Sequence, residues 1–435
     1  MDPEAFFSRF RNLERTGDFH QARTLDRIRE LLARVGDPQR ALPPVIVIAG
    51  SKGKGSTAHL TASILGAAGL RTGLYTSPHI VRWNERIVAH GQEITDAEAA
   101  ALIARFGAEF ERPCANGETA TYFEIMTAAA FLHFAASRLD AVVLEVGLGG
   151  TYDAVNICDA QVAVITQLGL EHQKVLGATL PEIAREKAGV MRPGQYVILE
   201  RQPLDATTAL WRHVEEIGAR KIDADRWSVH LGDSTRDHQE FSLLSGAVEY
   251  GPLRLGLLGD HQVRNARLAV MAAFAFGEKT GREMPDEAVR RGLLGVRVPV
   301  RMELIDGGSP AWLLDGAHNT ESADALADGV LKHFSGSPVR LAVGMLRDKD
   351  PAAFMNELKR LNPVEVIAVA VDSDRSWGPD ELHKLWEPLG IRARKASAWA
   401  EAERMIREDA QPGDLALVTG SLYLAGEARK ALRRS

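Results

Sequence analysis

The chain has 435 residues and a formal net charge of −6, with 52 Lys and Arg against 58 Asp and Glu. This length favours two or three domains, and 45% hydrophobic residues is typical of a globular protein. The lack of a basic excess argues against nucleic acid as a main partner, and no apolar run approaches the roughly 20 residues of a membrane span. The first residues lack the order of a signal peptide, and two cysteines are too few for a disulfide framework. A cytoplasmic enzyme is expected.

Strands and helices are expected to alternate in the first part of the chain. The patterns predict, in chain order, a helical stretch over residues 1–40, a strand over 45–49, a helix over 56–68, a strand over 69–75, a helix over 123–138 and strands over 141–146, 162–166 and 196–199. One face of the first stretch is apolar: Leu25, Ile28, Leu31 and Leu32. The alternation implies an α/β fold with a doubly wound, mainly parallel sheet. Residues 226–258 indicate a small antiparallel β insert.

A second α/β region is expected after a change of composition at residues 292–300. Four further strands are predicted there, over residues 311–314, 339–343, 364–371 and 415–418. Separated by helical segments, they make a second, smaller α/β domain, with a ligand cleft expected between the two domains.

The most specific motif is the glycine-rich segment over residues 50–57, directly after the strand Val45–Ala49. Glycines let the backbone approach a phosphate closely, and the N-terminus of the following helix adds partial positive charge. Lys54 would supply a charge to the β- and γ-phosphates. The spacing Gly-x-x-Gly-Lys-Gly-Ser-Thr departs from the commoner phosphate loop, which narrows the family. A flexible surface loop is the alternative.

Carboxylates and histidines after the strands are candidate metal ligands. Glu145 ends a very apolar strand, where a charge is costly unless it is paired or binds a metal. Glu145 could instead cap a turn, but a phosphate site on a neighbouring strand favours Mg²⁺. Glu171 and His172 follow the next strand and could lie at the same edge, although a lone histidine is more often structural.

Three further segments have roles that residue patterns leave open. Lys187 lies on a short helix, and helical patterning alone makes it a surface lysine. Residues 315–319, Asp-Gly-Ala-His-Asn, fit either a binding loop or an ordinary turn. Asn265 could contact a nucleobase, while Asp260 could simply cap the same helix, and both can be true.

The order of these motifs resembles the folylpolyglutamate synthases of the Mur ligase superfamily, including the bifunctional dihydrofolate synthases. The resemblance runs through nearly the whole chain. Besides the phosphate loop, it rests on residues 77–79, 84–87, 144–150 continuing through Asp153 and Asn156, 171–172, 176–177, 186–189, 315–319, 344–350 and 420–424. Each motif is modest alone, and their order across both regions is specific.

The resemblance implies an ATPase domain over residues 1–296 and a Rossmann-like glutamate-ligase domain over residues 297–435 that closes over it. It implies that ATP is bound by Ser51, Lys52, Gly53, Lys54, Gly55, Ser56, Asn265, Arg301 and Asp315, with Asn265 at the base and the last two reaching from the second domain. It implies two Mg²⁺ sites, with the ligands Ser77, Glu145 and His172. The resemblance further implies that Lys187 is carboxylated by CO₂ and, as an anion, helps to hold the second metal.

The same resemblance implies the substrate-binding residues. The pterin or folate would be lined by Tyr122, Phe123, Glu124, Tyr152, Asp153 and Ala154, and the incoming glutamate by His318 and Ser421. Catalysis would fall to Lys54, Lys187, His172, Glu145 and His318. Three positions depart from the common bacterial pattern: Lys52 for Asn, Thr151-Tyr152 for Arg-Leu, and Thr320 for Pro. Eukaryotic-type members tolerate the first two, so ligase chemistry is unaffected and pteroate specificity stays open.

The expected reaction is ATP-dependent amide ligation. An acceptor carboxylate attacks the γ-phosphate of MgATP, and the amino group of L-glutamate then attacks the acyl phosphate. The acceptor is dihydropteroate, the γ-carboxyl of a folate, or both, with a monofunctional folylpolyglutamate synthase as the alternative. A phosphate-loop kinase or NTPase would leave residues 315–319 and 420–423 without a role. A regulatory module and a peptidoglycan-precursor ligase are further alternatives. A monomer with small-molecule partners is expected.

Overall fold

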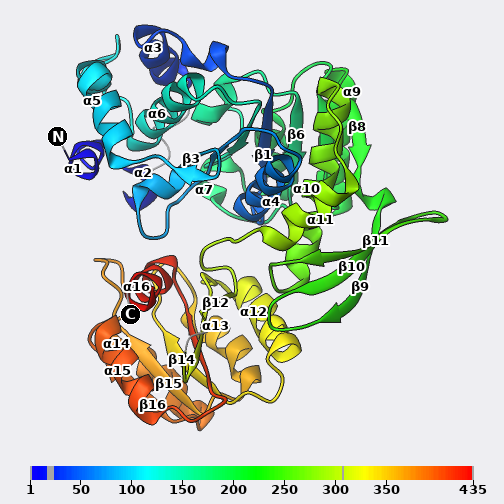
Figure 1. The fold of residues 1–435 in the computed structure, drawn as a ribbon. Coiled ribbons are helices and arrows are strands. Elements are labelled where there is room, and N and C mark those ends of the chain that lie inside the picture. Colours follow the sequence, from blue (N-terminus) through cyan, green and yellow to red (C-terminus); the bar gives the residue numbers. More distant parts are fainter. Residues whose placement is uncertain (1, 17–23, 306–307, 434–435) are drawn as a thin grey trace. The chain divides into compact units, whose positions relative to one another are not determined.

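The computed structural model describes residues 2–16, 24–305 and 308–433 and divides the chain into two compact units (Figure 1). Unit 1 comprises Met1–His230, Ser242–Leu253 and Arg264–Val296, and unit 2 comprises Leu231–Phe241, Arg254–Val263 and Arg297–Ser435. In the described parts, none of the helices combines the length and the apolar character that crossing a membrane requires.

Unit 1 is built on an eight-stranded sheet with the order β4-β3-β2-β5-β1-β6-β7-β8. The strands are β1 (Val45–Ala49), β2 (Thr72–Tyr75), β3 (Ile87–Ala89), β4 (Gln92–Glu93), β5 (Ala141–Glu145), β6 (Val162–Ile165), β7 (Tyr196–Leu199) and β8 (Arg220–Asp223). β1 runs parallel to β5 and β6 on its two sides, with Ile48 opposite Glu145 and Ala49 opposite Ile165. Strands buried on both faces need continuous apolar runs, which is why the sequence identified β1, β2, β5, β6 and β7. It missed β3 and β4, which are two or three residues long, and the polar edge strand β8. This register brings the residues after β1, β5 and β6 to one edge.

Helices cover this sheet in unit 1 (Figure 1). The helices of this unit are α1 (Pro3–Phe7), α2 (Leu13–Thr16), α3 (Asp26–Arg34), α4 (Lys54–Ala67), α5 (Asp96–Glu111), α6 (Tyr122–Ala136), α7 (Gln173–Leu176), α8 (Leu180–Ala188), α9 (Leu204–Glu216), α11 (Asp286–Gly295) and, from Arg264 on, α10 (Asp260–Thr280). The expected continuous helical stretch over residues 1–40 is wrong, because α1 ends at Phe7 and α2 is one turn long. Met1 and residues 17–23 of that stretch lie outside the described residues. Asp260 lies in the first turn of α10 and does not precede it as a cap.

The predicted β insert is a three-stranded sheet with the order β11-β10-β9. Its strands are β9 (Ser228–Ser234), β10 (Gln239–Ser245) and β11 (Val248–Leu255). Short connections, such as the turn closed by Thr235 and His238, join consecutive strands, and only antiparallel strands can be joined so tightly.

Unit 2 contains a six-stranded sheet with the order β12-β13-β17-β14-β15-β16. The strands are β12 (Glu303–Ile305), β13 (Ala311–Leu314), β14 (Val339–Val343), β15 (Glu365–Val369), β16 (Ala393–Ala396) and β17 (Leu415–Thr419), and the helices are α12 (Thr320–His333), α13 (Pro351–Leu358), α14 (Pro379–Trp386), α15 (Trp399–Asp409) and α16 (Leu422–Leu432). The sequence predicted the four inner strands and missed β12 and β16. These two lie at the edges, where charged residues interrupt the apolar pattern.

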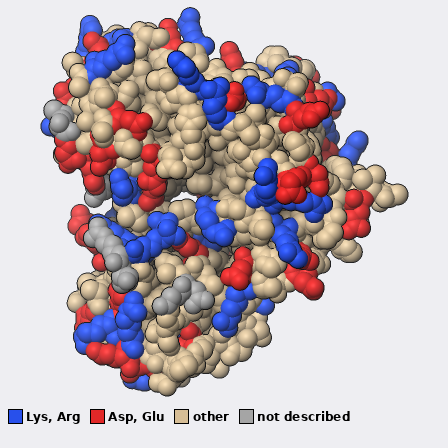
Figure 2. Space-filling view, in the orientation of Figure 1, with Lys and Arg blue, Asp and Glu red and all other residues tan. Residues whose placement is uncertain are grey.

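Single-turn 3₁₀ helices also occur among the described residues, at Pro38–Ala41, Trp83–Arg86, Ala154–Ile157, Ala224–Arg226, Lys359–Leu361 and Glu387–Leu389. On the face of unit 1 shown in Figure 2, basic and acidic side chains are interspersed among uncharged ones, in keeping with the net charge of −6.

Candidate active site

The phosphate loop connects β1 to α4 and depends on glycines at two positions. Gly50 and Gly53 have φ angles of 148° and 83°, which side-chain-bearing residues rarely adopt. A Cβ atom on Gly50 would lie 1.9 Å from Thr166 Oγ1, and one on Gly53 would lie 2.2 Å from Asn265 Oδ1. Gly53 therefore caps α4 without a side chain, and the first amide groups of the helix suit an anion. The loop is a cradle of the kind that fits nucleotide phosphates, with Asn265 at its rim.

Backbone hydrogen bonds attach this loop to the segment after β6. The amides of Ser51 and Lys52 both donate to the carbonyl of Gln167 at 3.0 Å, and Ser51 Oγ donates to the carbonyl of Gly169 at 3.2 Å. Lys54 Nζ donates to the carbonyl of Ser51 at 3.1 Å. Burial lowers the pKa of Lys52, and the charge of the nearby Glu171 acts against this shift. Two lysines therefore accompany the loop.

A buried carboxylate lies beside the first turn of α4. Glu145 is the last residue of β5 and only 5% exposed, and its Oε2 accepts a hydrogen bond from the amide of Ser77 at 3.0 Å. A Cβ atom on Gly55 would lie 3.3 Å from Glu145 Oε1. Ser77, Glu145 and the phosphate loop are thus brought together, and oxygen ligands beside a phosphate site suit Mg²⁺.

The third predicted metal ligand, His172, is the N-cap residue of α7 and has a left-handed backbone with a φ angle of 51°. Among residues 2–16, 24–305 and 308–433, no group of three or more His, Cys, Asp or Glu side chains is arranged to hold a metal. The predicted set contains only two such side chains, so nucleotide and water oxygens would have to supply the remaining ligands.

Lys187 is buried, and the surface position expected from helical patterning is wrong. The residue is 3% exposed in the last turn of α8, and its Nζ donates to the carbonyl of Gly50 at 2.7 Å. Burial and then the charge of Lys54 lower its pKa to about 7. Helical patterning cannot detect this burial, because the phosphate loop that covers Lys187 is distant in sequence. A lysine with this pKa is partly uncharged at neutral pH, the form that reacts with CO₂.

Two of the predicted acceptor residues flank the backbone of Gly147. A Cβ atom on Gly147 would lie 2.8 Å from the ring of Phe123 and 3.3 Å from Asp153 Oδ2. Asp153 accepts hydrogen bonds from the amides of Leu148 and Val155 at 2.9 and 3.0 Å, and burial raises its pKa to about 6. We call residues 147–154 the acceptor loop. Within it Tyr152 is exposed and Ala154 is buried.

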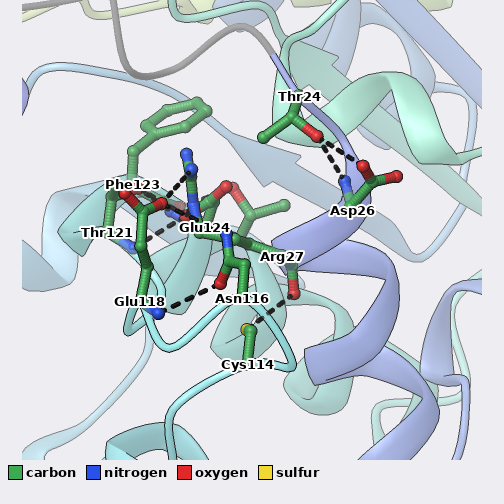
Figure 3. A network of polar contacts seen from close by, with 10 residues as sticks. Thr24, Asp26, Arg27, Cys114, Asn116, Glu118, Thr121, Phe123 and Glu124 are labelled. Atoms are coloured by element: carbon green, nitrogen blue, oxygen red, sulfur yellow. Dashed lines mark hydrogen bonds and ion pairs between the residues drawn. The ribbon is translucent and has the colours of Figure 1, made fainter.

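Glu124 and Tyr122 have structural partners. Glu124 accepts hydrogen bonds from the amide and hydroxyl of Thr121 at 2.7 and 2.9 Å, which caps α6, and from Arg27 Nε at 3.2 Å (Figure 3). The Arg86 guanidinium lies 5.1 Å from the centre of the Tyr122 ring. These contacts orient the first turn of α6, which also carries Phe123.

Sequence reasoning assigned no role to Arg86, although it lies in a motif of the resemblance. Arg86 is 1% exposed, pairs with Glu14 at 2.6 Å and donates from Nε to His79 Nδ1 at 2.9 Å. Burial and the Arg86 charge lower the pKa of His79 to about 4, so its ring is neutral. Arg86 therefore ties the Ser77–His79 turn to α2 and α6.

Unit 2 brings a second set of predicted residues together at the end of β13. Asp315 is buried and accepts hydrogen bonds from the amides of Met302 and Ala317 at 2.9 and 2.8 Å. Burial raises its pKa, and the Arg301 charge acts against this shift. Arg301 lies between two residues with left-handed backbones, Val300 and Met302, a strained arrangement that is common at functional sites.

The remaining motif segments of unit 2 meet at the same place. His318 Nδ1 lies 2.8 Å from the carbonyl of Gly316, and Ser421 Oγ caps α16 by accepting from the amide of Leu424 at 3.1 Å. The amide of Gly420 donates to the carbonyl of Ala317, and a Cβ atom on Gly420 would lie 2.6 Å from the carbonyl oxygen of Gly344. The loops after β13, β14 and β17 thus form one polar edge.

Two models of Mur ligase domains match the chain. The Mur ligase middle domain matches residues 48–273, and the Mur ligase glutamate ligase domain matches residues 300–422. These matches show that the chain is a Mur ligase, the class of protein to which both sheets and the loops at their edges belong.

Individual relatives narrow the class. The dihydrofolate synthase/folylpolyglutamate synthase of Bacillus subtilis is 33% identical over 94% of this chain and 95% of its own length. A probable bifunctional folylpolyglutamate synthase/dihydropteroate synthase of Halobacterium salinarum is 35% identical over 93% of this chain, which spans about half (49%) of that relative. The crystal structure of the bifunctional folylpolyglutamate synthase/dihydrofolate synthase of Yersinia pestis, complexed with AMPPNP and a Mn ion, has a TM-score of 0.80 and 30% identity, covering 94% of this chain and 93% of that one. The chain belongs to the folylpolyglutamate synthase/dihydrofolate synthase family of ATP-dependent Mur ligases, which confirms the predicted resemblance and fold class.

Proposed function

We propose that this protein joins L-glutamate both to dihydropteroate and to the γ-carboxyl group of tetrahydrofolate, with ATP converted to ADP and phosphate. The observation that carries the proposal is that the buried Lys187 touches two segments at once: its amine donates to the carbonyl of Gly50 in the phosphate loop, and its backbone packs directly against Gly150 of the acceptor loop. A kinase would need the cradle alone. The names of the relatives support both acceptors.

In the first half-reaction, the acceptor carboxylate attacks the γ-phosphorus of ATP, and ADP leaves. Ser51, Lys52 and Gly53, with the first turn of α4, hold the phosphates, and Lys54 neutralises charge on the transferring group. The acceptor lies against Phe123 and the acceptor loop, so its carboxylate is held beside the phosphates. In the second half-reaction the glutamate amine displaces phosphate from the acyl phosphate and forms the amide.

Ser77, Glu145 and His172 would hold Mg²⁺, and carboxylated Lys187 would contribute to a second metal site. When bound, these ions neutralise the phosphate charge. Lys187 fits carboxylation because its buried amine has a pKa near 7, and the charge of Lys54 lies close enough to favour a carbamate anion there. The relative bound to AMPPNP and Mn supports the use of ATP with a divalent metal.

We propose that residues 297–435 supply the glutamate-binding part, with His318 and Ser421 at the incoming glutamate and Arg301 and Asp315 at the nucleotide. Residues 1–296 supply the ATPase and acceptor part. Exclusion of water protects the acyl phosphate from hydrolysis. The two cysteines are free thiols, which fits a reducing cytoplasm, and we expect the enzyme to act as a monomer.

The test offers purified protein ATP and glutamate with dihydropteroate and tetrahydrofolate in parallel, and follows ADP and the glutamylated product. Amide formation with both acceptors is expected, and Lys54→Ala serves as the inactive control. Product with tetrahydrofolate alone would identify a monofunctional folylpolyglutamate synthase. A phosphorylated acceptor without amide, or full-rate ADP release without glutamate, would overturn the ligase proposal.

A further inference from the structure

The C-terminal end of α8, which carries Lys187, is bonded by Thr151 and Asn156 from a distant part of the chain and by Arg192, which follows the helix. The last carbonyl groups of any α-helix lack partners within the helix. Here the amide and the hydroxyl of Thr151 both donate to the carbonyl of Glu186 at 3.0 Å. The carbonyl of Gly189 accepts from Asn156 Nδ2 and from Arg192 Nη1, each at 2.9 Å. The acceptor loop and its flank therefore supply partners that the helix end needs.

Asn156 uses both ends of its amide in this arrangement. It is 6% exposed, and Nδ2 donates to the carbonyl of Thr151 at 3.0 Å as well as to Gly189. Its Oδ1 accepts from Arg192 Nη2 at 2.7 Å, and the same guanidinium nitrogen reaches the Asn156 carbonyl at 2.9 Å. The planar fork of arginine suits such paired contacts, and a lysine could not reproduce them.

The backbones of the acceptor loop and of the end of α8 are in close contact beneath these hydrogen bonds. A Cβ atom on Gly150 would lie 2.8 Å from the carbonyl oxygens of both Glu186 and Lys187, and one on Gly189 would lie 2.1 Å from Thr151 Oγ1. Backbone therefore meets backbone directly where the acceptor loop crosses the end of α8. A displacement of either segment moves the other.

We propose that Asn156 and Arg192 are positioning residues that fix the acceptor loop on the end of α8 and thereby set the affinity for the pterin-bearing acceptor. We call this set, Thr151, Asn156, Glu186, Gly189 and Arg192, the acceptor-loop junction. The inference rests on the proposed function for the identity of the acceptor. Neither residue touches the reacting atoms; both act through the position of Tyr152, Asp153 and Ala154.

The decisive variant is Asn156→Asp, which keeps size and shape but replaces the donor of two hydrogen bonds with an oxygen that repels both carbonyls. We expect the acceptor KM to rise about tenfold with the KM for ATP within about twofold, because two buried hydrogen bonds are lost at one site only. Hydrogen exchange should accelerate in residues 147–154. Arg192→Lys should raise the acceptor KM by about threefold, since one cationic donor remains.

Gln239→Glu is the matched control. Gln239 is also buried, and its Nε2 also donates to two backbone carbonyls, those of Leu257 and Gly259, at 2.7 and 2.9 Å. It should leave the acceptor KM unchanged. If Asn156→Asp does not fold, Thr151→Val replaces it, because it loses one hydroxyl bond at nearly constant shape while Thr151→Ser retains that bond.

Two results would overturn the positioning role of the acceptor-loop junction. The first is an unchanged acceptor KM in Asn156→Asp. The second is a rise in the ATP KM of this variant as large as the rise in its acceptor KM, with the same rises in Gln239→Glu. Failure of the proposed function is seen separately, as an absence of glutamylated product from the unmodified protein. The hydrogen-exchange rate of residues 147–154 measures how firmly the junction holds the acceptor loop, independently of turnover.

Discussion

Two buried charges, Lys187 in unit 1 and Glu365 in unit 2, are equally hidden from water but surrounded very differently. Glu365 is 1% exposed at the start of β15 and pairs with Arg340, Arg392 and Arg394. In the described part of the chain Lys187 forms no ion pair; its amine donates to a backbone carbonyl, and burial lowers its pKa to about 7. A buried charge that its own fold neutralises is structural, whereas one left to a carbonyl is available for chemistry.

The contrast also distinguishes the two ends of a parallel sheet. Lys187 packs against the loop that follows β1, at the carboxyl edge where α/β folds bind ligands, and Glu365 lies at the amino edge of its sheet. Substitutions at the first edge should change catalysis, and substitutions at the second should change stability.

The largest expected effect comes from Lys54→Ala. Removing the charge that faces the transferring phosphoryl group should lower kcat by about 10²–10³-fold, comparable to the loss of one transition-state donor. Acceptor- and glutamate-dependent ADP release measures it, with Lys52→Ala as a milder comparison. A fall of less than threefold would remove Lys54 from the mechanism.

Lys187→Met should lower kcat by about 10²-fold, since the side chain can no longer become an anion at the phosphate site. At neutral pH the same substitution should raise the free energy of unfolding, because it removes the cost of burying the Lys187 amine. The pKa of Lys187 falls from an ordinary value of 10.5 to about 7, so between these values the unfolded chain binds the extra proton.

In CO₂-free buffer the burial of Lys187 is therefore a cost to stability that shrinks as pH rises from 7 to 10.5. The free energy of unfolding rises with pH over this range by at most about 1.4 kcal/mol per pH unit and falls as pH drops toward 7. Denaturant unfolding across this range should show a shallower slope in Lys187→Met than in the unmodified protein. Parallel curves would mean that Lys187 is not a buried neutral amine.

His318→Ala should raise the KM for glutamate by about tenfold, the effect of one lost hydrogen bond to a charged group, and leave the acceptor KM unchanged. Initial rates with each substrate varied in turn separate the two. Equal changes in both KM values would contradict a glutamate-specific role for this edge of unit 2.

Glu365→Gln should have the smallest effect on catalysis. Losing the carboxylate leaves Arg340 without full compensation, and we expect a loss near the low end of roughly 3–5 kcal/mol, because Arg392 and Arg394 reach solvent. Denaturant unfolding measures this loss, and activity per folded molecule should be unchanged. A reduced kcat while the protein is fully folded would show that Glu365 also affects catalysis, and would contradict a purely structural role for it.

Local sequence patterns predicted most of the inner strands and the phosphate loop, because these features depend on residues close together in the chain. Strands β1, β5 and β6 are continuous apolar runs, and Gly50 and Gly53 satisfy local backbone requirements. The edge strands β12 and β16 were missed because charged residues interrupt their apolar pattern. The roles of the site residues stay predictions, with Ser77 and Glu145 now known to be in contact.

The sequence by itself determined most of the inner strands, the phosphate cradle and, through its motifs, the ligase family. Only the tertiary structure decided that Lys187 is buried against Gly50, that Glu124 pairs with Arg27, and that Asn156 bonds the end of α8. The physical reason is sequence separation. Burial and hydrogen bonding in these cases come from segments 30 to 140 residues apart, roughly, and local patterns carry no information on such partners.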